Sequence, residues 1–316
     1  MTDIFEPGAE NLLQIVIKKS LPVIMKFQIP LFLFCLVMGC TPKDSKQDHS
    51  WRPLWNGKDL NGWDTYLSSP YSGISKDEEG FIGLNNPSQD IIQVVELNDE
   101  PVIRISGIAW GMMFTNEDFK NYHLKLKVKW GEGKHVPREN GPRDSGLLYH
   151  GYGEPGSAYV WMASQELQIQ EGDMGDYWPT GDIEIDVPCE LRDSLFYTYH
   201  EEGDLRTFYF ADILDTDVMD SLSKRRVIKS MDAEKPHGQW NDVELICYGD
   251  SSIHIVNDLV LMRLYNSRKM SDKTPVAKGK IILQSEGAEV FYKDIEIREI
   301  DSIPEKYREN NLKSIQ

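Results

Sequence analysis

Basic residues are scarce relative to acidic ones in this 316-residue chain. Its 34 lysine and arginine residues stand against 51 aspartate and glutamate residues, and the formal net charge is −17. Nucleic-acid binding requires clustered basic side chains, so this balance argues against a nucleic-acid partner. It also argues against electrostatic docking on anionic lipid.

Cysteines and metal-binding motifs are also few. Neither CxxC nor HExxH occurs, so we expect neither a structural zinc site nor a zincin. Of the four cysteines, Cys189 and Cys247 lie in the body of the chain. Two cysteines make no disulfide framework. A disulfide between them and a buried free thiol at Cys247 both remain open.

Long apolar runs are rare as well. Residues 27–38 form one that is interrupted by Gln28 and Pro30 and is short for a membrane span. It follows Met25 and Lys26 and has the character of a signal-peptide core. Its end, Leu-Val-Met-Gly-Cys40, resembles a bacterial lipobox, in which Cys40 becomes the lipidated first residue. This predicts a lipoprotein anchored in the bacterial cell envelope; an ordinary signal peptide or an uncleaved anchor is the alternative.

These features divide the chain into unequal parts. We interpret residues 1–24 as a mis-assigned upstream start, 25–40 as the signal peptide and 41–50 as a polar tether. Residues 51–302 are expected to form one domain. Within it, residues 201–238 have few strand patterns and are expected to form a long excursion, and residues 303–316 a polar tail.

Helical periodicity is missing, whereas strand periodicity is common. Residues 122–130 alternate, with Leu124, Leu126, Val128 and Trp130 on one face and three lysines, at 125, 127 and 129, on the other. This pattern predicts a half-buried antiparallel strand with a solvated lysine face. Similar short runs occur at 145–150, 166–170, 182–187, 242–248, 253–256, 280–284 and 294–300, separated by turn residues. Many strands without intervening helices predict an all-β sandwich or barrel.

Six segments, in this order, carry a family resemblance. They are LWNGKDLNGW (54–63), DSGLLYH (144–150), ELQIQE (166–171), GQWNDVEL (238–245), IHIVN (253–257) and GKIILQSEGAEV (279–290). Together they resemble the 3-keto-disaccharide hydrolase family over about residues 51–302. The resemblance implies an antiparallel two-sheet jelly-roll sandwich, concanavalin A-like or laminarinase-like, with one concave face. It also implies cleavage of a glycosidic bond in a carbohydrate that carries a 3-keto group.

The segment at 166–171 is the most polar of the six. Alternate strand residues share a face, so Glu166, Gln168 and Gln170 point one way and the intervening leucine and isoleucine the other. The spacing Glu166-x-Gln168-x-x-Glu171 resembles the E-x-D-x-x-E pattern of laminarinase-type glycosidases, in which two carboxylates flank the bond. Here a glutamine replaces the middle aspartate, and Glu171 joins the face of Glu166 only through a bulge. A solvated strand face is the alternative.

A 3-keto sugar allows a different reaction, because its ketone acidifies the neighbouring C2–H bond. A base removes that proton, the enolate expels the C1 substituent, and water adds back. The reaction needs a base, a group that stabilises the enolate oxygen and an acid for the leaving oxygen. Glu166 is the first candidate for the base. The candidates for the acid are Glu171, Asp173 and His150, the last with a structural role equally open, and those for enolate stabilisation are Arg143 and Lys134.

Aromatic and polar residues near these segments are candidates for substrate binding. Trp161, Tyr177 and Trp178 flank the polar segment and can offer rings on which a sugar stacks, with core packing as the alternative for Trp161. The other predicted substrate-binding residues are Gln168, Gln170, Asp173, Arg143, Gln284 and Glu286. Many family members carry Asp-His-Gly where this chain has Ser285-Glu286-Gly287, so imidazole chemistry is excluded there.

The cofactor and the class of activity stay open at this stage. A calcium or magnesium ion could bind through Glu166, Glu171, Asp173 and Asp176, although no EF-hand spacing occurs. Besides a 3-keto-glycoside enzyme, two alternatives remain: a non-catalytic lectin-like domain, and an ordinary glycoside hydrolase that uses Glu166 and Glu171. In all three cases the expected ligand is a carbohydrate.

Overall fold

The computed structural model describes residues 49–74, 79–86, 90–192, 196–210 and 225–308. The predictions for the signal peptide, for Cys40 and for most of the tether lie outside these ranges. Within them, no helix combines the length and the apolar character needed to cross a membrane.

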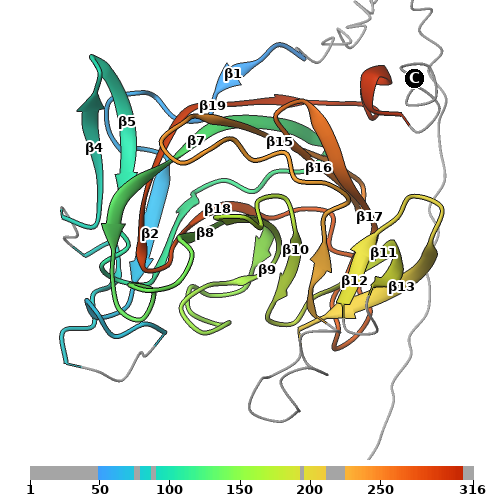
Figure 1. The fold of residues 1–316 in the computed structure, drawn as a ribbon, viewed down its shortest axis with the longest axis horizontal. Helices are drawn as coiled ribbons and strands as arrows, with labels where there is room; N and C mark the ends of the chain where they lie inside the picture. Colours follow the sequence, from blue (N-terminus) through green and yellow to red (C-terminus); the bar gives the residue numbers. More distant parts are fainter. Residues whose placement is uncertain (1–48, 75–78, 87–89, 193–195, 211–224, 309–316) are drawn as a thin grey trace, which may run out of the picture. The chain divides into compact units, whose positions relative to one another are not determined.

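The described chain is all-β and mostly antiparallel, and it forms a jelly roll of two stacked sheets (Figure 1). The back sheet consists of β4 (Ile92–Leu97), β5 (Glu100–Ile105), β19 (Ala288–Glu299), β7 (Tyr122–Lys134), β15 (Asn241–Tyr248), β16 (Ser251–Val256) and β17 (Leu259–Arg268), with β1 (Arg52–Pro53) on β19. The predicted fold class is confirmed.

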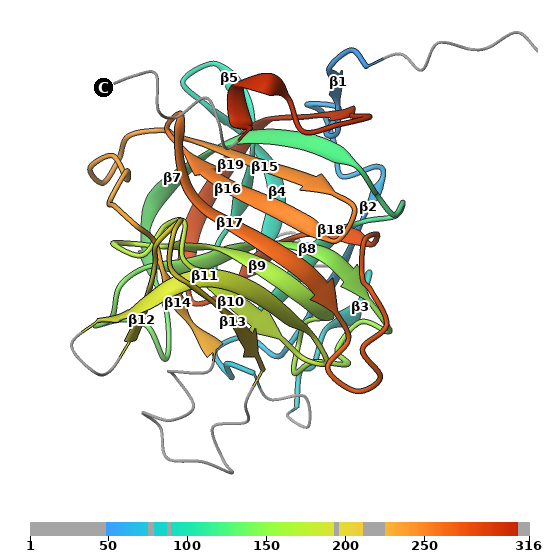
Figure 2. The ribbon, with the colours of Figure 1, turned by 90° about the vertical axis from the view of Figure 1, so that its right-hand side faces the viewer.

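The front sheet runs in the order β3 (Gly83–Leu84), β2 (Trp63–Leu67), β6 (Gly111–Thr115), β18 (Lys280–Ser285), β8 (Asp144–Tyr152), β9 (Ala163–Gln170) and β10 (Tyr177–Thr180). It continues through β14 (Val227–Ile228), β12 (Phe196–Tyr199), β11 (Glu184–Arg192) and β13 (Asp204–Tyr209). Strand β17 pairs with β16 and also with β11, so it joins the two sheets (Figure 2).

The main core lies between the sheets. Leu124, Leu126 and Val128 of β7 are buried there against Leu147 of β8 and Leu167 of β9, as the alternating pattern predicts. The three lysines of β7 point away from this core, but they are half-buried rather than fully exposed. The reason is pairing across the sheet: Lys125 forms an ion pair with Glu296, Lys127 with Asp242, and Lys129 lies over the ring of Trp240.

The described residues add detail to two boundary predictions, although 211–224 of the predicted excursion lie outside them. The excursion at 201–238 contains β13, which pairs with β11 from Glu184↔Tyr209 to Cys189↔Asp204. Only Phe208 of this strand is buried, so its sequence has no alternating pattern to detect. The start of the predicted polar tail forms a 3₁₀ turn, η1 (Glu305–Tyr307), and Tyr307 packs on Ile246 and Ile253 at the outer face of the back sheet.

Cys189 and Cys247 are free thiols and do not form a disulfide. Both are buried. Cys247 lies in the core between the sheets, whereas Cys189 belongs to a separate apolar cluster around β11.

Candidate functional site

A pocket of about 360 Å³ lies on the face of the front sheet that is turned away from the back sheet. We refer to it as the front pocket. It collects residues from β8, β9, β10 and β18 together with loop residues around them. Among the predicted site residues, those that line it are Trp161, Glu166, Gln168, Gln170, Trp178, Gln284 and Glu286.

Strand register explains how distant segments meet there. Glu166 of β9 pairs with Trp178 of β10 on one side and with Leu148 of β8 on the other. Gly146 of β8 lies beneath the pocket: a Cβ atom built on it would be 2.3 Å from Gln284 Oε1 and 2.4 Å from Glu166 Oε1. Because Gly146 has no Cβ atom, the ends of the Gln284 and Glu166 side chains can lie over β8 at this position.

Three carboxyl groups come together at the pocket, namely Asp144, Glu166 and Glu286, which are 1%, 5% and 9% exposed. Arg138 Nη2 forms ion pairs with both Asp144 and Glu286, in the latter case at 2.8 Å. Gln170 donates a hydrogen bond of 2.6 Å to the same Asp144 oxygen. The guanidinium of Arg138 thus occupies the space between two of the three carboxyls.

Burial sets the protonation of this cluster. It raises the pKa of Glu166 well above its usual range, and the nearby Glu286 adds to the rise, while Arg225 and Arg138 oppose it. The pKa of Glu286 is likewise raised by burial against the opposing charge of Arg138. Because like charges disfavour double ionisation, the charge of Glu286 and burial both favour the neutral form of Glu166.

Several polar atoms of the pocket have no hydrogen-bond partner among the residues that the structure describes. They are Asp144 Oδ1, Gln168 Oε1, Gln284 Oε1, Trp110 Nε1 and Trp178 Nε1. Leaving a buried polar atom unpaired costs about 1–3 kcal/mol, so such atoms indicate a ligand with matching groups. The set contains both acceptors and donors, as a ligand rich in hydroxyl groups requires.

Aromatic rings form one wall of the pocket. The Trp178 ring is contacted by the guanidinium groups of Arg225 at 5.5 Å and Arg226 at 5.7 Å. Trp161 lies 6.0 Å from Trp110, and its Nε1 donates to the carbonyl of Gly111 at 3.0 Å. Trp161 therefore lines the pocket and packs in an apolar cluster at the same time.

Two predicted site residues point into the protein instead. Tyr177 is fully buried in the cluster around β11, and its hydroxyl donates to Gln165 Oε1 at 2.5 Å, so it offers no sugar platform. His150 lies in the β8 bulge with a φ of 53°, and its ring is 6.5 Å from Tyr122 and 5.4 Å from Tyr149. It is fully buried, burial lowers its pKa to about 4, and it does not line the pocket.

The acids that follow β9 are also placed elsewhere. Glu171 begins the turn after β9 and pairs with Arg143 at 3.1 Å, so no bulge brings it to Glu166. Asp173 and Asp176 both bind Arg226. Neither these three acids nor Arg143 and Lys134 line the front pocket.

This arrangement also separates the carboxyls proposed for a metal ion. Over the described ranges, no group of three or more His, Cys, Asp or Glu side chains is arranged to hold one. A calcium or magnesium requirement stays a prediction, for which chelation followed by an activity measurement is the test.

Sequence reasoning missed Arg138 and Asp144. Arg138 lies in an irregular loop, and no periodic pattern points to it. Asp144 begins a segment that the family resemblance includes, so its position at the start of β8 offered a signal.

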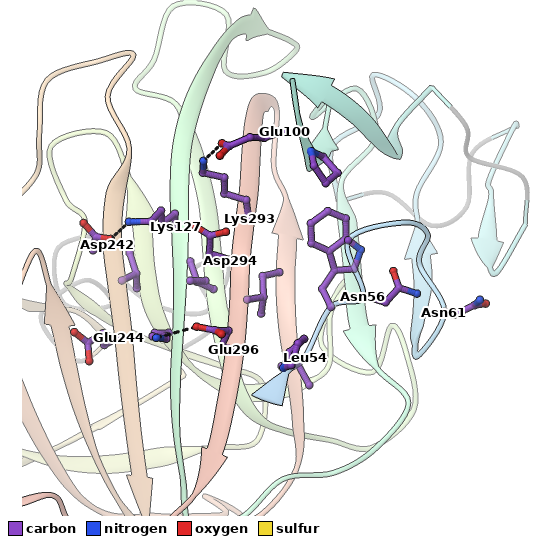
Figure 3. Close-up of a pocket in the computed structure, with 18 residues that line it drawn as sticks. Leu54, Asn56, Asn61, Glu100, Lys127, Asp242, Glu244, Lys293, Asp294 and Glu296 are labelled. Carbon is purple, nitrogen blue, oxygen red and sulfur yellow. Dashed lines mark hydrogen bonds and ion pairs between the residues drawn. The ribbon is translucent and has the colours of Figure 1, made fainter. Parts of the chain in front are cut away.

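A larger groove of about 870 Å³ lies on the back sheet, between β7, β19 and the loop that carries Trp55 (Figure 3). Six of its charged side chains form three ion pairs: Lys127 with Asp242, Lys293 with Glu100, and Lys125 with Glu296. Because most of its charges are paired and the buried carboxyl cluster lies in the front pocket, we place the functional site in the front pocket.

Comparison with known proteins gives distant structural matches. A crystal structure named a "putative glycosyl hydrolase" from Parabacteroides distasonis is 17% identical, with a TM-score of 0.45 over 79% of this chain and 94% of that one. The endo-beta-1,3(4)-glucanase SCLam of family GH16 is 12% identical, with a TM-score of 0.42 over 78% and 90%. The carbohydrate-binding module CBM66 from Bacillus subtilis is 8% identical, with a TM-score of 0.37 over 76% and 96%.

Family assignment rests on the sequence instead. No curated protein matches the chain significantly. The sequence model of one family, described as the 3-keto-alpha-glucoside-1,2-lyase-like domain, matches residues 50–298. Since this match covers most of the 316 residues, the chain belongs to the family of 3-keto-alpha-glucoside-1,2-lyase-like domains.

Proposed function

We propose that this protein cleaves the glycosidic bond of a 3-keto-glycoside in the front pocket, by removal of the C2 proton, elimination and hydration. The observation that carries the proposal is the buried pair of Glu166 and Glu286 beside the guanidinium of Arg138. This arrangement supplies the three groups that the reaction needs: a base, an acid and a cation for the enolate oxygen.

Glu166 is assigned as the base on the ground of register. Directly paired strand residues have Cβ atoms about 4.5–5.5 Å apart, so the side chains of Glu166 and Trp178 start side by side, and both line the front pocket. A sugar stacked on that ring has its C–H bonds next to the carboxylate. A raised pKa makes the carboxylate a stronger base once it is ionised.

The reaction starts at C2. Glu166 takes the C2 proton, and the electron pair forms an enolate with the C3 ketone, whose oxygen Arg138 stabilises. The enolate re-forms the ketone, a C1–C2 double bond forms, and the C1–O bond breaks. Burial raises the pKa of Glu286 against the opposing charge of Arg138, so Glu286 is assigned as the acid that gives its proton to the leaving oxygen, in place of the acids predicted from the sequence. Water then adds to C1 and gives a proton to ionised Glu286, while Glu166 returns its proton to C2, so both carboxyls regain their starting states.

Matched substrates separate this proposal from its alternatives. The purified protein should cleave an aryl 3-keto-glucoside and leave the unoxidised glucoside intact, with slower turnover when C2 carries deuterium. Cleavage of the unoxidised glycoside would indicate an ordinary glycoside hydrolase. Binding of either sugar without turnover would indicate a lectin-like domain.

Glu166→Gln tests the assignment of the base. Glutamine keeps the shape and the hydrogen bonding but cannot accept the proton, so kcat should fall by about 10²–10⁴-fold with little change in binding. A kcat near that of the wild type would move the base to Glu286.

A further inference from the structure

A second cavity, of about 270 Å³, lies where the last described residues cover the outer face of the back sheet. Its walls include Ser251 and Ser252 of β16, Arg263 and Tyr265 of β17, and Tyr307 and Arg308. It is separate from the front pocket and plays no part in the function proposed above. One water takes about 30 Å³ in the liquid, so the cavity holds a group of several atoms.

The guanidinium of Arg263 is the unusual group in this cavity. Arg263 is only 3% exposed. Its Nε and Nη2 atoms have no hydrogen-bond partner among the described residues. A buried charge without hydrogen-bonded compensation costs several kcal/mol, so a partner for this guanidinium is expected.

The two nitrogens without a hydrogen bond define the shape of that partner. Nε and Nη2 form one edge of the guanidinium and point their N–H groups the same way. Carboxylates and phosphates bind such an edge with two parallel hydrogen bonds. Arg308 adds a second positive charge to the cavity wall, although its Nε already donates to the carbonyl of Ile303.

We propose that this cavity binds the oxyanion group of a small organic ligand, held by the Nε–Nη2 edge of Arg263. The shared chemistry is a carboxylate or a phosphate carried on a polar organic body. The rival partner is Glu201, whose Oε1 atom lies 3.7 Å from Arg263 Nε, which is beyond hydrogen-bond distance. Glu201 is half exposed and its carboxylate competes with the ligand.

Calorimetric titration with D-glucuronate, inorganic phosphate and neutral D-glucose tests the proposal. At least one of the two anions should bind, and glucose should not compete with it. Arg263→Gln should weaken binding by about 10–100-fold, the value of a charge-assisted pair of hydrogen bonds. Arg263→Lys, which keeps the charge but loses the planar pair of N–H donors, should also weaken it. Glu201→Gln should strengthen it.

Two controls locate the site. Trp178→Ala, in the front pocket, should leave anion binding unchanged, as should Arg206→Gln on the exposed strand β13. Several outcomes overturn the proposal: no binding of either anion to the wild type, equal binding to Arg263→Gln, or loss of binding in Trp178→Ala. A Glu201→Gln variant that loses stability without binding an anion more tightly would identify Glu201 as the true partner of Arg263.

Discussion

Gly146→Ala should damage the front pocket far more than it damages the fold. The new Cβ atom would lie 2.3 Å from Gln284 Oε1 and 2.4 Å from Glu166 Oε1, so both side-chain ends must move by about an ångström to restore contact distances. Both atoms are the ends of flexible side chains, and Gly146 does not have a positive φ, so the backbone accepts alanine.

The size of each effect follows from this geometry. Overpacking costs about 1–3 kcal/mol, and alanine offsets about 0.4–1 kcal/mol of this by restricting the unfolded chain. The free energy of unfolding should therefore fall by about 2.6 kcal/mol at most. A displacement of about 1 Å in a catalytic group costs about 10²-fold in rate. We therefore expect a folded protein with kcat about a hundredfold lower.

The assay combines turnover of a 3-keto-glucoside with chemical denaturation of the same preparation. Gly141→Ala is the control, because a Cβ there meets only the carbonyl of Arg138, at 3.8 Å, and no positive φ is required. The control should keep both activity and stability. Full activity in Gly146→Ala would show that the placement of Glu166 and Gln284 over this glycine does not matter for the reaction.

Three further predictions concern other parts of the chain. Trp178→Ala should raise KM about tenfold and change kcat little, because it removes a stacking surface; a fall in kcat alone would contradict this. Burial lowers the pKa of His150 to about 4, so the folded state takes up this proton only well below the usual pKa of 6.5. Relative to the wild type, His150→Gln should therefore gain thermal stability as the pH falls from 6.5 to 4, and parallel curves would refute the reasoning. Cys40→Ser should release the protein from the membrane fraction; retention without lipid in the intact mass would disprove lipidation.

The strands could be predicted from sequence because alternation is a local property. Leu124, Leu126 and Val128 point one way whatever strand lies beside them, and burial of that face is the simplest way to hide it from water. The same logic predicted that Glu166, Gln168 and Gln170 share a face, and all three line the front pocket. Strand β13 escaped detection because Phe208 is the only residue that it buries.

Which side chains line the site depended on contacts between strands that no local sequence pattern encodes. Tyr177 and Trp178 are neighbours in sequence, and pairing with β9 decides that Trp178 faces the pocket and Tyr177 the core. His150 continues the strand that carries Leu148, but the bulge after Tyr149 turns it into the core.

Sequence alone therefore determined the fold class, the polar strand and the family of the chain, because these depend on alternation and on short motifs. Only the tertiary structure could bring Arg138, Asp144 and Glu286 around Glu166, since these residues come from segments up to 148 positions apart. The raised pKa values arise from that assembly, because burial and mutual repulsion exist only once the sheets have packed.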